Sequence, residues 1–153
     1  MFEGSVNIPN YDIHVQLAGG ENNAWTNNDL TNYYITIPKS NVETAFWLES
    51  DRMLGLALTE QSVKIQKEVV IEEFKQQHLN RPYGDVQHLI RALAYKVHPY
   101  RWPTIGITPQ HIEQATRDSI MQFYHRYYTP GNAILSVVGN ISLDEVVQMA
   151  EKW

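Results

Sequence analysis

The side chains best suited to metal or acid–base chemistry are six histidines, but their spacing matches no known motif. They are His14, His78, His88, His98, His111 and His125. No two of them lie three or four residues apart, so the sequence contains no HExxH, HxxEH or HxxxH pair. His78 and His88 are ten residues apart, and Pro82 between them breaks any common helix. We therefore expect scattered surface or half-buried histidines.

A glutamate at position 73 is the more informative candidate. On a helix, one face is formed at i, i+3, i+4 and i+7 by Gln66, Val69, Val70 and Glu73. A carboxylate that shares a stripe with two valines is unusual unless it is paired or bound to a metal. Two interpretations stay open on these grounds: a structural ion pair or partly exposed side chain, and a metal ligand. Glu72 lies about 100° round the helix and is expected to be an ordinary surface residue.

A short segment, Asn23-Ala24-Trp25, could bind a peptide. It follows Gly19-Gly20 and precedes a polar turn at 27–29, which is typical of a strand at the edge of a sheet. Such a strand offers unpaired N–H and C=O groups to an extended peptide. An edge protected by neighbouring loops is an equally good interpretation of the local sequence.

Composition excludes several classes of protein. The 153 residues, 43% hydrophobic and 19% charged, suit one globular domain. The net charge of -5 and the absence of a basic tract argue against nucleic-acid binding. No apolar run is long enough to span a bilayer. With no cysteine, the chain has no disulfide, thiolate nucleophile or Cys-ligated metal.

Periodicity and breaker residues predict the elements that must position these side chains. Residues 1–10 read as a loop, 13–17 as either a strand or a short helix, and 23–37 as a hairpin ended by Pro38. A nearly continuous apolar run predicts a strand over 133–138. Helices are expected at about 41–54, 60–79, 82–94, 109–127 and from 142 to the C-terminus. Thr59 and the Ser142/Glu145 capping box mark two of the helix starts, and Gly55 marks a helix end.

Taken in order, several tracts resemble the pitrilysin/insulinase family of zinc peptidases, which includes the mitochondrial processing peptidases. The tracts are MFEGS, GGENNAWTNNDLTNYY, WLESDRM, KEVVIEEF, RPYGD, HPYRWPTIG and YYTPGNAILSVVGN. They span nearly the whole chain in family order. The resemblance implies an α+β fold, a mainly antiparallel sheet with helices packed on one face. It also implies a single partial peptidase domain over 1–153, without its first strands and metal helix.

The resemblance also implies a site. The family binds zinc through HxxEH plus a glutamate about 75 residues further on, which falls on Glu73. A tract like MFEGS follows HxxEH almost immediately in the family, so both histidines and the catalytic glutamate are expected to be missing and no catalytic residue is assigned. Gln66 stands where many members have an assisting glutamate, and an amide cannot act as a base. Asn23, Ala24 and Trp25 match the edge strand that pairs with substrate backbone.

Three functions compete on this basis. The first is a fragment of a zinc metalloendopeptidase, inactive alone because Glu73 supplies one of the three protein ligands that catalytic zinc needs. The second is a noncatalytic homologue or subunit that binds peptides, and the third is an unrelated α+β module. The implied partners are a peptide or protein substrate and the remaining peptidase domains or a partner subunit. A partner copy, giving a homodimer, is another way to cover the open sheet edge. The resemblance points to a bacterial periplasm, while the sequence itself shows no export signal.

Overall fold

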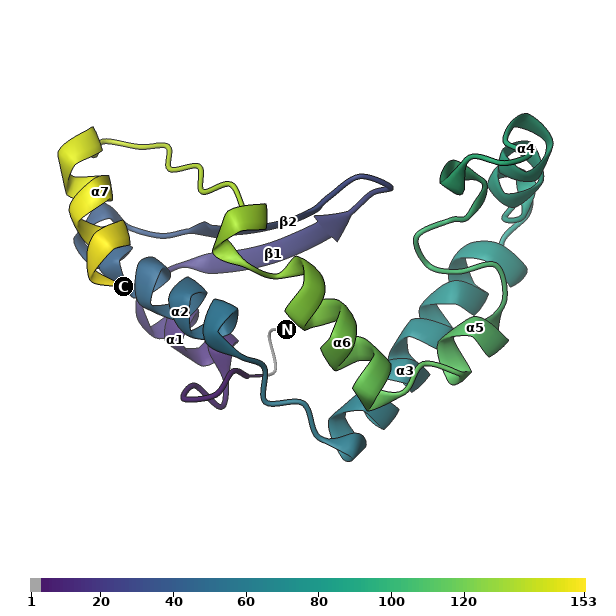
Figure 1. The fold of residues 1–153 in the computed structure, drawn as a ribbon, viewed down its shortest axis with the longest axis horizontal. Helices are drawn as coiled ribbons and strands as arrows, with labels where there is room; N and C mark the ends of the chain where they lie inside the picture. The colour runs from purple at the N-terminus through teal and green to yellow at the C-terminus, as the bar shows by residue number, and fades with distance from the viewer. Residues whose placement is uncertain (1–3) are drawn as a thin grey trace. The chain divides into compact units, whose positions relative to one another are not determined.

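The computed structural model describes residues 4–153 and shows a helix-rich α+β fold with one two-stranded sheet (Figure 1). The chain order is α1 (Tyr11–Leu17), β1 (Glu21–Thr26), β2 (Thr31–Thr36), α2 (Val42–Leu54), α3 (Glu60–Phe74), α4 (Val86–Ala94), α5 (Pro109–Glu113), α6 (Arg117–Tyr127) and α7 (Leu143–Lys152). A π-helical turn, Lys75–Leu79, extends α3, and 3-10 turns occupy Lys39–Asn41, Pro99–Arg101 and Pro130–Asn132. The predicted fold class is confirmed.

Local signals in the sequence set several element boundaries. The Thr59 hydroxyl accepts from Ser62 N–H at the start of α3, and Ser142 does the same from Glu145 N–H at the start of α7. Each bond satisfies one of the four N–H groups that a helix start leaves without an intrahelical partner. Helix α2 ends just before Gly55, as predicted. The hairpin is antiparallel because its strands are consecutive and joined by the short turn Asn27–Leu30.

Four expectations need correction or completion. Residues 13–17 are helical, within α1. The predicted third helix begins at Val86 rather than Pro82, after a turn. The predicted helix 109–127 is two helices, because Thr116 and Ser119 exchange capping hydrogen bonds that start α6. The loop predicted over 1–10 is described only from residue 4, since 1–3 lie outside the described residues.

The largest correction concerns 133–138, which is not a strand among the residues described. Its backbone starts extended, with Ala133 at φ −125° and ψ 148°. A β-strand requires a hydrogen-bonded neighbour, and residues 4–153 provide none for this segment. Ile134 and Val138 are consequently 97% and 94% exposed.

The described residues fall into two compact units that are considered separately. The first contains residues up to 25, 32–58 and 121–153, and the second contains 26–31 and 59–120. The first unit buries an apolar cluster of Ile8, Tyr11, Val15 and Leu48. In the second unit, Val63 and Phe74 on α3 are buried. The single partial domain predicted over 1–153 stays a prediction.

Two charged residues are buried in the first unit, both near the end of α2. Asp51 accepts from the Ser5 hydroxyl and from both the backbone and side-chain N–H of Asn7. Arg52 contacts Glu49, and its guanidinium lies 3.8 Å from the centre of the Tyr33 ring. These contacts offset part of the cost of removing the two charges from water, and Nε and Nη1 of Arg52 are buried without a hydrogen-bond partner among residues 4–153. No helix in residues 4–153 has the length and apolar character needed to cross a membrane.

Candidate functional site

Glu73 lies in the last turn of α3 and is exposed. Its carboxylate accepts one hydrogen bond from the neutral amide of Gln77, at 2.9 Å. The neighbouring Glu72 instead pairs with the ammonium of Lys75, at 2.5 Å. Of the two adjacent carboxylates, Glu72 therefore forms an ion pair, whereas the hydrogen-bond partner of Glu73 is uncharged.

The stripe of α3 that contains Glu73 faces solvent. Gln66, Val69 and Glu73 all lie on an exposed face of α3, and Val69 is 54% exposed. The buried face is the one formed by Val63 and Phe74, with Val70 and Ile71 partly buried. Helical periodicity places Val69 and Glu73 together but does not say which face meets the core. The metal-ligand role of Glu73 stays a prediction.

The residues described here do not by themselves form a catalytic zinc site. No group of three or more His, Cys, Asp or Glu side chains suited to a metal occurs in residues 4–153. Catalytic zinc uses three protein ligands and one open position. A carboxylate such as that of Glu73 is at most one of these three ligands.

The outer edge of β1 contains the three predicted substrate-binding residues. Asn27 N–H donates to Leu30 C=O at 3.0 Å. In a regular ladder continued from this pair, Ala24 occupies a non-hydrogen-bonded position, so its N–H points away from β2. The Asn23 side-chain oxygen accepts from that N–H at 2.8 Å. Trp25 is 50% exposed beside it. The geometry leaves β1 with an outer edge that no other strand of residues 4–153 covers.

The turn of the hairpin, 26–31, is bonded to the loop that follows α4, within the second unit. Arg91 donates to the Asn28 side chain at 2.9 Å and to the Tyr100 carbonyl at 3.1 Å. The Tyr100 hydroxyl donates to Asp29, and this bond to a carboxylate raises the pKa of Tyr100. These polar contacts restrain the turn from which β1 and β2 extend.

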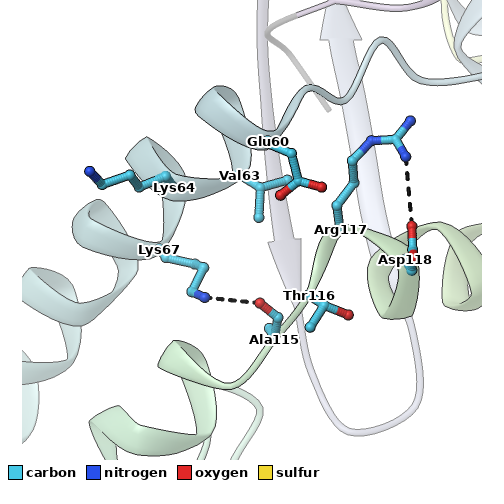
Figure 2. A pocket seen from close by; sticks show the side chains of 8 residues that line it. All are labelled: Glu60, Val63, Lys64, Lys67, Ala115, Thr116, Arg117 and Asp118. Atoms are coloured by element: carbon cyan, nitrogen blue, oxygen red, sulfur yellow. Dashed lines mark hydrogen bonds and ion pairs between the residues drawn. The ribbon is translucent and has the colours of Figure 1, made fainter.

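A hollow of the second unit lies between α3 and the junction of α5 and α6 (Figure 2). Lys67 reaches across it and donates to the carbonyls of Glu113 and Ala115, the latter at 2.9 Å. These are carbonyls at the end of α5, which a cation stabilises. Arg117 and Asp118 pair at 3.7 Å at the start of α6. The lining contains no histidine, and its Lys67 and Arg117 side chains bond to neighbouring protein groups.

Two histidines that the sequence separates are brought together by the fold. The rings of His78 and His88 lie 4.4 Å apart between their centres. The prediction of scattered histidines missed this pair because the chain reverses between α3 and α4. The signal for that reversal was present in Pro82-Tyr83-Gly84, a turn sequence in which Tyr83 adopts φ 60°.

Comparison with known proteins identifies the family. Residues 1–107 match the family described as insulinase, peptidase family M16, and residues 114–153 match the family described as the peptidase M16 inactive domain. The chain belongs to peptidase family M16. The resemblance to the insulinase family inferred from the sequence is thereby confirmed.

Individual M16 relatives agree with this assignment. The chain is 33% identical over 142 residues to the zinc protease PqqE of Helicobacter pylori, covering 93% of this chain and 32% of that protein. It is 28% identical over 144 residues to a protein named as a probable mitochondrial-processing peptidase subunit beta of Schizosaccharomyces pombe, covering 93% and 31%. The chain thus spans about a third of these relatives. The zinc cofactor of complete M16 members is confirmed by the names of the bacterial relatives.

A crystal structure of a protease from Helicobacter pylori has the same fold as this M16 chain. The TM-score is 0.93 with 32% identity, over 99% of this chain and 36% of that one. Members of family M16 work with further domains or subunits, as the name of the mitochondrial processing subunit indicates.

Proposed function

We propose that this chain is a segment of an M16 zinc metalloendopeptidase in which Glu73 supplies one zinc ligand. The observation that carries the proposal is the exposed stripe of α3 within the region that matches the family. There, Val69 is 54% exposed and Glu73 has a neutral hydrogen-bond partner. An apolar side chain beside a carboxylate without a countercharge suits a face that another element covers and a cation neutralises.

Glu73 would bind through its carboxylate oxygens, and Gln77 would hold that carboxylate by donating to Oε1. Gln77 would thus act as the outer partner that ligating carboxylates usually have. When bound, zinc polarises a peptide carbonyl and lowers the pKa of a water molecule to about 7. Gln66, in the position of the family's assisting glutamate, can donate and accept hydrogen bonds but cannot take a proton. Proton transfer is therefore assigned to a residue outside this chain.

Strand β1 would position the substrate. An extended peptide that pairs with the outer edge at Asn23, Ala24 and Trp25 would accept from Ala24 N–H in place of the Asn23 side chain. Trp25 would contribute apolar contact area next to the peptide. Binding by main-chain hydrogen bonds fixes the direction of a peptide and gives little sequence specificity.

Asp51 would order the start of the first unit. Its bonds to Ser5 and Asn7 fix the segment that the family joins to its HxxEH helix. The other expected partners are the remaining peptidase domains or a partner subunit, and a second copy of the chain is one candidate for that role. A periplasmic location follows from the likeness alone.

The first test is metal analysis after dialysis together with a fluorogenic-peptide assay on the 153-residue chain. We expect no turnover and far less than one zinc per chain, because one carboxylate does not hold catalytic zinc against water. Stoichiometric zinc with turnover would refute the proposal.

The second test applies if the coding sequence upstream of residue 1 encodes HxxEH in frame. It then uses the longer protein that includes this motif. Glu73→Gln should lower its zinc content and its turnover, because an amide is a poor ligand for zinc. Glu72→Gln is the matched control, since that side chain pairs with Lys75. Equal effects of the two changes would contradict the assignment of Glu73.

The alternative is a noncatalytic peptide-binding homologue, and the free edge of β1 favours it because main-chain pairing needs no metal. A stop codon directly upstream, with peptide binding but no turnover, would support it. Ala24→Pro removes the outward N–H and should weaken peptide binding, whereas Ala24→Val keeps that N–H and serves as the control. Equal peptide affinity in both variants would exclude this edge as the binding surface.

A further inference from the structure

His78 and His88 form a pair of imidazoles in the second unit. His78 lies in the π-helical turn after α3, and His88 lies in α4. Their ring centres are 4.4 Å apart and their planes cross at 80°. The buried Phe74 ring packs against both, at 5.1 Å from His78 and 5.9 Å from His88. One apolar side chain thus restrains both rings.

Each imidazole is anchored through one nitrogen to a backbone carbonyl. His78 Nδ1 lies 2.9 Å from Gly84 O, and His88 Nε2 lies 3.2 Å from Gly106 O. A carbonyl only accepts, so each of these nitrogens must carry the proton. The neutral rings then have an unshared electron pair on His78 Nε2 and on His88 Nδ1. A histidine that ligates a metal usually donates its other N–H to a carbonyl or carboxylate in this way.

The unshared electron pair on His88 Nδ1 accepts no hydrogen bond from the residues described. His88 Nδ1 is buried and has no hydrogen-bond partner among residues 4–153. Buried polar atoms are nearly always satisfied, so an exception calls for an explanation such as a bound ion or water. A cation between the two rings would satisfy this nitrogen and use His78 Nε2 as well.

We propose that His78 and His88 bind a divalent transition-metal cation of the kind that prefers imidazole, such as Zn²⁺, Cu²⁺ or Ni²⁺. Two imidazoles on one tetrahedral zinc, with Zn–N bonds of about 2 Å, have ring centres about 5 Å apart. The observed contact is edge-to-face with ring centres 4.4 Å apart, so this geometry requires the rings to separate by less than about an ångström and to rotate until both free nitrogens face the cation. The other coordination positions are filled by water, which makes the site weaker than a three-ligand centre. Bound, the cation would tie the end of α3 to α4 across the turn at Gly84.

The test is a calorimetric titration of the metal-stripped chain with Cu²⁺, Ni²⁺ and Zn²⁺ separately. We expect one cation per chain for at least one of these metals. Loss of an outer-shell partner already lowers metal affinity about 10- to 100-fold, so His78→Gln and His88→Gln should each cost at least about 10-fold. His125→Gln is the matched control, because His125 is exposed on α6. Circular dichroism checks that each variant retains its helix content.

A second measurement does not depend on the variants folding. Trace Cu²⁺ should broaden the NMR signals of His78, His88 and Phe74 in the unaltered chain before those of the other histidines. Absence of binding at millimolar metal, which would mean that His88 Nδ1 is satisfied by water, overturns the proposal. Broadening centred on other histidines overturns it as well.

Glu73→Gln separates this site from the proposed peptidase function. We expect that variant to bind the cation as the unaltered chain does. Binding that is lost in Glu73→Gln and kept in both histidine variants would place the cation at Glu73 and refute the histidine pair. A site with two protein ligands releases its cation during dialysis. The histidine pair is therefore not expected to add zinc to the metal analysis of the dialysed chain proposed above, and the two tests can be interpreted separately.

Discussion

Replacement of Asp51 by alanine should destabilise the chain by about 3 kcal/mol. Asp51 is buried and accepts hydrogen bonds from the Ser5 hydroxyl, from the backbone and side chain of Asn7, and from the Ile8 backbone. A hydrogen bond to a charged group contributes about 1.5–3 kcal/mol, and the buried Ser5 hydroxyl falls at the upper end of that range. Asn7 is exposed, so water replaces the carboxylate there and its two bonds add about 1 kcal/mol at most.

The assay is urea unfolding of the chain followed by far-ultraviolet circular dichroism. The midpoint should fall with an unchanged m-value, since the surface exposed on unfolding is the same. Asp118→Ala is the matched control: its side chain is 84% exposed, so the change should stay within about 0.5 kcal/mol. A destabilisation by Asp51→Ala no larger than that of the control would show that the buried network does not stabilise this unit.

The same residue predicts a pH dependence with a definite sign. Burial acts to raise the pKa of Asp51, but the bonds from Ser5 and Asn7 outweigh it and hold that pKa below its ordinary value of 3.8. The contribution of Asp51 is therefore complete above about pH 4 and is lost as the pH falls through the lowered pKa. The stability difference between the parent chain and Asp51→Asn should shrink below pH 4. A difference that stays constant down to pH 2 would mean that the carboxylate does not titrate with folding.

Two further substitutions test the first unit. Tyr124→Phe removes a hydroxyl that donates to the carbonyls of Arg52 and Met53, at 2.6 and 2.9 Å. The change should lower the free energy of unfolding in urea by about 1–2 kcal/mol. Tyr127→Phe is the control, because the Tyr127 side chain is more exposed. Ser142→Ala removes the cap of α7 and should lower the free energy of unfolding by about 1 kcal/mol, with some loss of the helical circular dichroism signal. An unchanged urea midpoint would mean that α7 does not unfold with the rest of its unit.

The features that sequence predicted well depend on contacts between residues close together in the chain. The cap of α3 at Thr59 needs only a bond to Ser62, and the cap of α7 at Ser142 needs only Glu145. The hairpin of β1 and β2 is set by the polar turn between its strands. The break between α5 and α6 escaped prediction because it contains no glycine or proline and rests on the pair Thr116 and Ser119.

The features that sequence could not predict depend on which surfaces meet in three dimensions. Periodicity groups Glu73 with Val69 on one stripe of α3 but leaves open whether that stripe is exposed, which in the structure it is. The contact of His78 with His88 needs a chain reversal whose exact path the turn residues do not specify. The buried Asp51 gave no local signal, since its partner Ser5 lies 46 residues away.

Several apolar side chains of this M16 chain are uncovered within residues 4–153. Val69 on α3 and the segment containing Ile134 and Val138 are exposed to a degree unusual for such side chains in a folded domain. An extended, apolar segment without a strand partner is a site for sheet pairing or aggregation. Since the chain covers 32% of the zinc protease PqqE, the relatives contain ample further sequence to cover such surfaces. Residues 133–138 have the composition of a strand, but residues 4–153 provide no strand for them to pair with.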